Sequence, residues 1–589
     1  MAKPEFCDVI LKGGITSGVV YPLAVVALSE QFRFKNVGGA SAGAIAAALT
    51  AAAEHRRRTQ AGSRKGFDAL SELPKWLGER EGDGSRLFQL FQPCLATKPL
   101  FEIGAAALGK PPSAGSCAAA IRACGVFPWS AWRGVTPGLI LLVAAASLEG
   151  NAGLRVCVAI AGLAASVLGL GVSLLLRIVS SASQSLPENF YGLCSGGSTD
   201  GSKVALTDWL EQKLDDVAGH QDPARPLVFG DLWGAGHDQA HADVNLEMLT
   251  TNLSHGRPHR LPFAEKLFFF ERGEFERLFS KRVVEWLVAH PHRGESREYP
   301  GFHRLPDSAE LPVVVATRMS LSFPILLSAV PLYAVDYDRS PDAAPERCWF
   351  SDGGICSNFP VHFFDAPLPG WPTFAFNLRP WEAKFEEANG IYLPDDNKGG
   401  LKEWWTRFES GGGLSRISGF LLSIFDAMQN WRDNVQAQMP GYRDRVAHVG
   451  LKAQEGGLNL NMPSSVITDL AGRGKRAAEI FARRFSNPAP DDRLTWDNHR
   501  WVRLRSLLGL LQEWLPHISR IYRGQGADFD RMMIDPPSYR LNAAQQAAAQ
   551  DTLDTLAALG ALLDQLPPRE QLDEGAPRPR PTLRATPRI

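Results

Sequence analysis

The chain has 589 residues, and its 62 Lys and Arg against 63 Asp and Glu give a formal net charge of −1, so charge favours no nucleic-acid partner. With 45% hydrophobic and 21% charged residues, the composition is that of a folded protein with room for about two to four domains. The eight cysteines form no C-x-x-C pair and no metal spacing, which predicts reduced thiols and neither a metal site nor a secretory context.

The first predicted element is a buried strand, Cys7–Leu11, which follows an N-terminus without an apolar leader. A glycine-rich loop, Lys12–Gly18, connects it to an apolar helical stretch. Backbone N–H groups in such a loop can hold a phosphate or the oxyanion of an acyl-transfer intermediate. The loop is not a P-loop, because Val19 and Val20 occupy the Lys and Ser/Thr positions. An ordinary glycine-rich turn is the alternative.

The second predicted strand leads into the pentapeptide Gly39-Ala40-Ser41-Ala42-Gly43, which has the form G-x-S-x-G. An Ala-rich helical stretch, residues 44–53, follows it. Strand, sharp turn and helix are the context of a nucleophile elbow, which exposes its serine while the glycines relieve crowding. Small residues also gather where a helix packs on a sheet, so the pattern alone leaves both interpretations open.

Residues 100–190 are predicted to be an insertion that contains a hydrophobic helical hairpin. Residues 156–176 carry no charge and could cross a bilayer, and residues 134–148 are a shorter uncharged run. We expect a membrane-associated protein, integral through residues 134–176. Arg133 and Arg177 at the outer ends favour a cytoplasmic catalytic domain. The alternative is a hairpin that forms a lid or packs in a partner interface.

A third chemically informative segment is Ser351-Asp352-Gly353-Gly354, which follows a short apolar run. An aspartate at a strand end, followed by two glycines, can project into a cleft. The alternative is a simple Asp-Gly turn.

Together, the glycine-rich loop, the elbow and the late Asp-Gly-Gly resemble the patatin-like phospholipase family. The similarity covers residues 5–95, 190–380 and 440–485. It implies a serine–aspartate dyad without histidine, with Ser41 as nucleophile and Asp352 as general base. The implied oxyanion hole comes from the N–H groups of Gly13, Gly14 and Ile15, beside the elbow residues Gly39, Ala40, Ala42 and Gly43 and the motif glycines Gly353 and Gly354.

The loop departs from the family pattern Gly-Gly-Gly-x-Arg-Gly. Ile15 replaces the third glycine and Ser17 the arginine. The N–H donors survive this change, because any residue except proline supplies one. The lost positive charge could be replaced by Lys12, which stands next to the loop, or its side chain could point elsewhere.

The resemblance implies an α/β fold with a three-layer α/β/α patatin-like core over residues 1–487. We expect a helical C-terminal appendage over residues 488–566 and a disordered tail over residues 567–589.

The implied activity is hydrolysis of fatty-acyl esters in membrane phospholipids or other glycerolipids, with the bilayer as partner and no cofactor. An aspartate is a weak base in water, but a desolvated site would raise its pKa. Two alternatives remain open. One is a histidine-dependent serine esterase, for which His448 follows Asp352 in a permitted order. The other is a catalytically silent, membrane-anchored scaffold.

Overall fold

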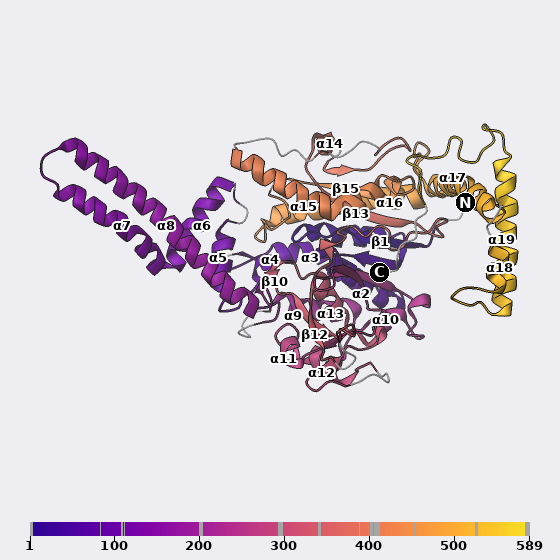
Figure 1. The fold of residues 1–589 in the computed structure, drawn as a ribbon, viewed down its shortest axis with the longest axis horizontal. Helices are drawn as coiled ribbons and strands as arrows, with labels where there is room; N and C mark the ends of the chain where they lie inside the picture. Colours follow the sequence, from indigo (N-terminus) through magenta and orange to yellow (C-terminus); the bar gives the residue numbers. More distant parts are fainter. Residues whose placement is uncertain are drawn as a thin grey trace.

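The computed structural model describes the chain except residues 1–3, 83, 108–109, 111, 199–203, 293–297, 340–342, 388, 401–404, 406–412, 453, 525–527 and 583–589. Within these described residues, 11 strands form one mixed sheet in the order β14-β15-β13-β1-β2-β6-β12-β11-β8-β9, and β7 pairs with β6. The α/β class expected from the sequence is confirmed at this level (Figure 1).

The strands of this sheet are β1 (Phe6–Leu11), β2 (Arg33–Gly39), β6 (Asn245–Asn252), β7 (Arg257–Leu261), β8 (Phe269–Phe270), β9 (His303–Arg304), β11 (Val330–Ala334), β12 (Glu346–Asp352), β13 (Thr373–Pro380), β14 (Ile391–Tyr392) and β15 (Val446–Leu451). Two small sheets pair β3 (Arg80–Glu81) with β4 (Gly84–Ser85) and β5 (Gly192–Cys194) with β10 (Ile325–Leu327).

The helices of the first half are α1 (Tyr21–Ser29), α2 (Ala42–Thr59), α3 (Lys65–Gly78), α4 (Arg86–Gln89), α5 (Lys98–Ala107), α6 (Pro112–Val126), α7 (Pro128–Ser147), α8 (Ala152–Glu188), α9 (Leu206–Ala218) and α10 (Phe229–Trp233). Those of the second half are α11 (Arg272–Phe275), α12 (Lys281–Ala289), α13 (Val313–Ser320), α14 (Ala383–Glu387), α15 (Gly413–Ala437), α16 (Ser464–Ser486), α17 (Trp496–Tyr522), α18 (Phe529–Ile534) and α19 (Ala543–Asp564).

The centre of the sheet is parallel, since β15, β13, β1, β2 and β6 run in the same direction. Loops that leave the carboxyl ends of these strands therefore meet at one edge of the sheet, where ligands bind in open α/β sheets. The glycine-rich loop leaves β1 and the elbow leaves β2 at this edge. The strand β12 approaches antiparallel to β6 and ends at Asp352.

The two faces of the sheet are covered unequally. Strand alternation in β1 directs Val9 and Leu11 into the large core, which α1, α2, α3, α9 and α16 complete, while Ile10 joins a smaller cluster on the other face. That smaller cluster is built mainly from the irregular segment 359–363 and Tyr442. The second face therefore has a thinner cover than the full helical layer expected for an α/β/α sandwich.

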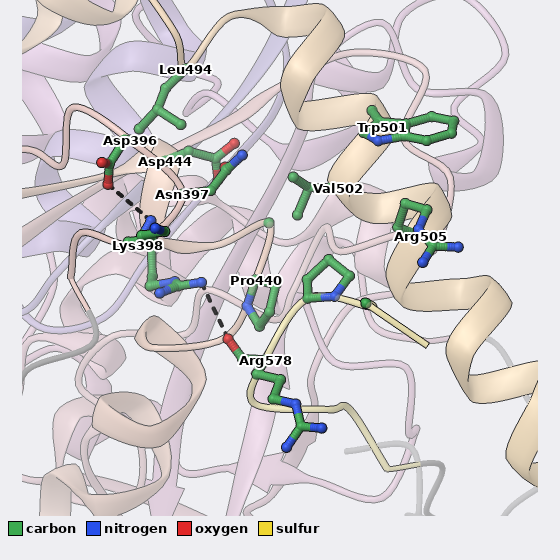
Figure 2. A pocket seen from close by; sticks show the side chains of 14 residues that line it. Asp396, Asn397, Lys398, Pro440, Asp444, Leu494, Trp501, Val502, Arg505 and Arg578 are labelled. Atoms are coloured by element: carbon green, nitrogen blue, oxygen red, sulfur yellow. Dashed lines mark hydrogen bonds between the residues drawn. The ribbon is translucent and has the colours of Figure 1, made fainter. Parts of the chain in front are cut away.

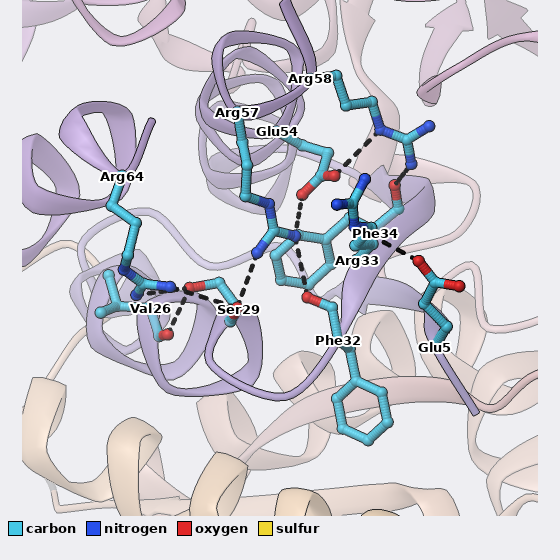
Figure 3. Close-up of polar contacts among 10 residues, drawn as sticks. All are labelled: Glu5, Val26, Ser29, Phe32, Arg33, Phe34, Glu54, Arg57, Arg58 and Arg64. Carbon is cyan, nitrogen blue, oxygen red and sulfur yellow. Dashed lines mark hydrogen bonds and ion pairs between the residues drawn. The ribbon is translucent and has the colours of Figure 1, made fainter. Parts of the chain in front are cut away.

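The helix that follows the elbow is fixed at its far end by a buried ion cluster (Figure 3). Glu54 is fully buried and pairs with both Arg57 and Arg58. Arg57 donates to the carbonyls of Ser29 and Phe32, and Arg58 donates to that of Phe34. These bonds join the end of α2 to the start of β2 and so hold the strand and the helix that flank Ser41.

The inserted hairpin consists of α7 and α8, which project from the sheet in Figure 1. The two helices approach so closely that a Cβ atom on Gly138 would lie 2.3 Å from the carbonyl oxygen of Gly162. Within the described chain, α8 is the one helix long and apolar enough to cross a membrane by length and composition. The shorter α7 does not meet that criterion, so of the segment 134–176 expected to be integral only the part in α8 is a candidate span.

The C-terminal helices and part of the tail contact one another. In the appendage, Gln512 of α17 donates to the carbonyl oxygen of Leu563 in α19. Arg505 of α17 donates to the carbonyl oxygens of Leu572 and Glu574, and Ala576 is buried. Residues 572–576, within the tail expected to be disordered, thus contact α17, and residues 583–589 lie outside the described part.

We expect Glu54→Gln to lower the free energy of unfolding by about 3 kcal/mol, because two arginines would lose their buried counter-charge. The measurement is urea denaturation followed by circular dichroism. The control is Glu79→Gln, whose side chain is 45% exposed and pairs with Arg86. Its effect should stay below about 0.5 kcal/mol, and equal effects of the two variants would contradict the structural role of Glu54.

Candidate active site

Ser41 lies at the sharp turn between β2 and α2, and its backbone is strained. Its φ of 55° and ψ of −132° are rare for a residue with a Cβ atom, and the residue is only 3% exposed. A Cβ atom on Gly43 would lie 2.1 Å from the carbonyl oxygen of Leu11, and one on Gly39 would lie 2.5 Å from that of Gly43. Only glycine at both positions lets the turn pass this close to β1.

Sheet register brings Asp352 to the level of Ser41. Gly39 pairs with Met248 of β6, and Asp352 pairs with Thr250 two residues further along the same strand. Ser41, two residues beyond Gly39, therefore reaches the same height at the edge of the sheet. Gly353 continues close beside β6, since a Cβ atom there would lie 2.1 Å from the carbonyl oxygen of Leu249.

The carboxyl group of Asp352 is buried, and among the described residues only one of its two oxygens accepts a hydrogen bond of ordinary geometry. The N–H of Gly354 donates to Oδ1 at 2.7 Å, and within the described chain Oδ2 accepts no hydrogen bond of ordinary geometry. Burial raises the pKa of Asp352 to about 7, and the Ser41 hydroxyl and the Gly354 N–H oppose that shift by interacting with the charged form. The Ser41 hydroxyl thus faces the carboxyl group, without an optimal hydrogen bond to it.

The end of α13 supports both residues. The N–H of Ser41 donates to Ser320 Oγ at 3.3 Å, and the N–H of Asp352 donates to the carbonyl oxygen of Ser322 at 3.0 Å. Sequence reasoning gave these serines no role in the site, because their contacts bridge positions far apart in the chain.

The glycine-rich loop offers fewer free donors than the sequence predicts. The N–H of Gly13 donates to the carbonyl oxygen of Asn358 at 2.8 Å, so it is already engaged. Among the described residues, no acceptor is found for the N–H groups of Gly14, Ile15 and Ala42. Ala42 follows Ser41 and was expected only as part of the elbow, yet its N–H is available at the start of α2.

Asn358 fixes the loop from the side of the aspartate. Besides accepting from the Gly13 N–H, it donates through Nδ2 to the Gly13 carbonyl oxygen at 3.3 Å. A Cβ atom on Gly13 would lie 1.9 Å from Asn358 Oδ1 and 2.9 Å from the Cβ of Ser41. Gly13 is therefore required for close approach to Ser41.

Lys12 does not take the place of the missing arginine. Its ammonium group is buried and donates to Asn377 Oδ1 at 3.0 Å and to the carbonyl oxygen of Leu378 at 3.2 Å. Burial lowers the pKa of Lys12 to about 8. The side chain points to β13, so it does not supply the positive charge that the glycine-rich loop lacks.

His448 is remote from Ser41. It lies on β15, buried beside Asn377, and burial lowers its pKa well below the usual range. Three strand spacings separate β15 from β2 in the sheet, a distance of about 14 Å. A hydrogen bond between His448 and Ser41 is therefore not possible in this arrangement.

An apolar cavity adjoins the site. Its lining includes Ile15 of the loop and Ala42, Ile45 and Ala46 of α2, together with Trp209 of α9. Leucines of α3, α4 and the segment 321–327 complete the wall. A hydrocarbon chain is the kind of ligand that such a lining accommodates.

A second cavity, of about 390 Å³, has a mixed lining of charged and apolar residues and lies between the 396–398 loop, α17 and the C-terminal segment (Figure 2). Its charged groups are largely engaged: Arg443 donates to the carbonyl oxygens of Gly399 and Arg578, and Asp444 accepts from His499 at 2.7 Å. The cavity contains none of the predicted site residues, and its contacts anchor the C-terminal segment.

Comparison with known proteins identifies a relative along the whole chain. No protein-family model matches. The RpoH suppressor of Rhizobium meliloti (strain 1021) is 35% identical over 654 aligned positions, which cover 99% of this chain and 99% of that protein. The chain belongs to the family of this RpoH suppressor. The relative's name states no chemistry, so the activity must be argued from the site.

Solved structures give only distant similarity. VipD from Legionella pneumophila is 14% identical, with a TM-score of 0.28 over 98% of this chain and 89% of that chain. Full-length ExoU, in complex with SpcU from the type III secretion system of Pseudomonas aeruginosa, is 14% identical, with a TM-score of 0.22 over 98% and 75% of the two chains. TM-scores this low do not establish a shared fold.

The raised pKa of Asp352 predicts that this residue costs stability above neutral pH. Between pH 4 and pH 7 the folded state binds a proton that the unfolded state has released, so stability falls as the pH rises. We expect Asp352→Asn to be more stable than the wild type at pH 8, by up to about 4 kcal/mol. Urea denaturation at pH 8 and pH 5 measures the free energy of unfolding of both proteins. The advantage of the variant over the wild type should be smaller at pH 5. A variant less stable than the wild type at pH 8 would contradict the unfavourable burial of the carboxylate.

Proposed function

We propose that this chain is a patatin-like lipid acyl hydrolase that cleaves fatty-acyl esters of membrane glycerolipids through Ser41, with Asp352 as general base. The observation that carries the proposal is the strained serine facing a buried carboxyl group whose Oδ2 has no hydrogen-bond partner of ordinary geometry among the described residues. Backbone strain and a buried polar atom without a hydrogen bond both lower the stability of the fold. Such features are found most often at functional sites.

In the proposed reaction, Ser41 Oγ attacks the acyl carbonyl carbon while Asp352 Oδ2 takes the hydroxyl proton. The carbonyl oxygen becomes an oxyanion, for which the N–H groups of Gly14, Ile15 and Ala42 are the candidate donors. The C–O bond then breaks, and the leaving alcohol takes the proton from Asp352. Water attacks the acyl-serine, gives a proton to Asp352, and releases the fatty acid as Ser41 regains its proton.

The environment of Asp352 supports its assignment as base. An ordinary aspartate is too weak a base at neutral pH, whereas a pKa of about 7 lies near the operating range. The same shift leaves the group half protonated near pH 7, so one residue can both accept and return a proton. The distance of His448 from the elbow counts against the histidine-dependent alternative.

The surroundings of the site support a lipid substrate. The apolar cavity begins at Ile15 and Ala42, beside the candidate oxyanion donors, where an acyl chain would extend from the reacting carbonyl. The apolar α8 supports association with the membrane that contains the lipid. We propose that the catalytic domain lies on the cytoplasmic side, as Arg133 and Arg177 at the base of the hairpin favour.

The decisive test compares the wild type with Ser41→Ala and Asp352→Asn. We expect each variant to lose at least a factor of about 1000 in fatty-acid release from phospholipid vesicles. A fluorophosphonate probe should label the wild type and fail to label Ser41→Ala. The control is His448→Gln, which should retain activity within about tenfold because it lies about 14 Å away.

Full activity in Ser41→Ala would refute the proposal. Activity lost in His448→Gln and retained in Asp352→Asn would favour the histidine-dependent esterase. No turnover and no labelling in the wild type would favour the silent scaffold.

We also expect Ala46→Phe to shift the preference toward short acyl chains, because the larger side chain would fill the apolar cavity. The measurement is the rate ratio for p-nitrophenyl butyrate over p-nitrophenyl palmitate, which should rise at least about tenfold. Ala69→Phe is the matched control, because Ala69 is also partly buried and does not line the cavity. An unchanged ratio in Ala46→Phe would place the acyl chain elsewhere.

A further inference from the structure

The helix α15 carries a continuous apolar stripe on its outer face. Within it, Met428 and Trp431 are 69% and 61% exposed, and the helix is 25 residues long. At 3.6 residues per turn the stripe falls within a sector of about 100°. Its members are Ile417, Leu421, Ile424, Met428, Trp431 and Val435, all of which are exposed.

In the C-terminal half of α15, the opposite face is polar and contacts the protein. The carboxylate of Asp433 is buried, and it accepts from Ser357 Oγ at 2.9 Å and from the N–H of Phe359 at 2.8 Å. Gln429 donates to the carbonyl oxygen of Gly354, two residues after Asp352. The inner face of α15 thus holds the segment that connects Asp352 to Asn358.

This orientation is the reverse of that in an ordinary surface helix, whose apolar stripe faces the core. Leaving large apolar side chains in water is unfavourable, and soluble monomers rarely expose large contiguous apolar patches. The polar contacts to the active-site segment fix the inner face, so the apolar stripe is available for an apolar surface outside the protein.

We propose that the apolar stripe of α15 docks on a lipid surface and that docking holds the active-site segment in its catalytic arrangement. The stripe runs over 19 residues, from Ile417 to Val435, with its ends about 27 Å apart, which suits a helix lying along a membrane surface. Exposed Arg416 and Arg432 flank it on either side, where they can meet anionic headgroups. The apolar α8 and the first turns of α15 both lie toward the left of Figure 1.

The proposal has two parts. Docking of the stripe on lipid is argued from the geometry of α15 alone, whereas the effect of docking on catalysis rests on the proposed function. The test therefore has two arms. The first detects contact between lipid and the stripe whether or not the chain hydrolyses anything, and the second compares hydrolysis at a lipid surface with hydrolysis in solution.

The first arm uses an environment-sensitive NBD label on Met428→Cys, in full-length protein with the exposed Cys117 and Cys157 replaced by serine. Leu422→Cys is the matched control, since Leu422 is 68% exposed on the same helix and lies about 140° from the centre of the stripe. Labelled parent protein without the new cysteine gives the background. With vesicles of phosphatidylglycerol and phosphatidylethanolamine, we expect at least a threefold emission increase at position 428 and little change at position 422.

Equal changes at the two positions, or no change at position 428, would overturn lipid docking by the stripe. An emission increase at position 428 that follows protein concentration without vesicles would overturn it as well, because a second copy of the chain would then cover the stripe.

The second arm measures the rate on phosphatidylglycerol vesicles divided by the rate on soluble p-nitrophenyl butyrate. We expect this ratio to fall at least tenfold in Met428→Ser/Trp431→Ser and to stay unchanged in Leu422→Ser. An unchanged ratio in the double variant would overturn the coupling. If the wild type hydrolyses neither substrate, the proposed function fails, while the fluorescence arm still decides whether the stripe docks.

Discussion

The carboxyl group of Asp352 is buried at the end of β12 with one oxygen bound by the Gly354 N–H and the other without a partner of ordinary geometry. Removing a charge from water this completely is unfavourable, so much of the surrounding structure can be understood as holding it there. The end of α13 fixes the backbone of Asp352, and the inner face of α15 fixes the segment that follows. The same burial that costs stability brings the pKa near neutrality, where a base is useful.

Ser41 reaches this carboxyl group because three neighbouring strands have a fixed register. β2 and β12 both pair with β6, and their pairing positions on it differ by two residues. The turn that follows β2 covers this offset in the two steps from Gly39 to Ser41. A turn this tight requires glycine at positions 39 and 43. The buried ion cluster at Glu54 then holds the far end of α2 to the start of β2. The pairing register on β6, the turn after β2 and the ion cluster at Glu54 thus together determine the position of the Ser41 hydroxyl group.

The local parts of this arrangement could be predicted from the sequence, and the long-range parts could not. The strands at the elbow follow from short apolar runs and glycine positions. The engagement of the Gly13 N–H depends on Asn358, and the direction of Lys12 depends on Asn377, both more than 340 residues away. The orientation of α15 was also beyond sequence reasoning, since helical periodicity places an apolar stripe toward the core. The contacts of residues 572–576 with α17 are likewise long-range and have no signal in the local sequence.

The most direct measurement of the central claim is the mass of the peptide that contains Ser41 after acid quenching of the protein during turnover of a defined phosphatidylglycerol. An acyl-serine intermediate adds the mass of one fatty acyl group to that peptide, and fragmentation places it on a single residue. The account predicts the acyl group on Ser41, with accumulation that decreases when Asp352 is replaced by asparagine. Continued release of fatty acid with the Ser41 peptide unmodified, or an acyl group on another residue, would contradict it.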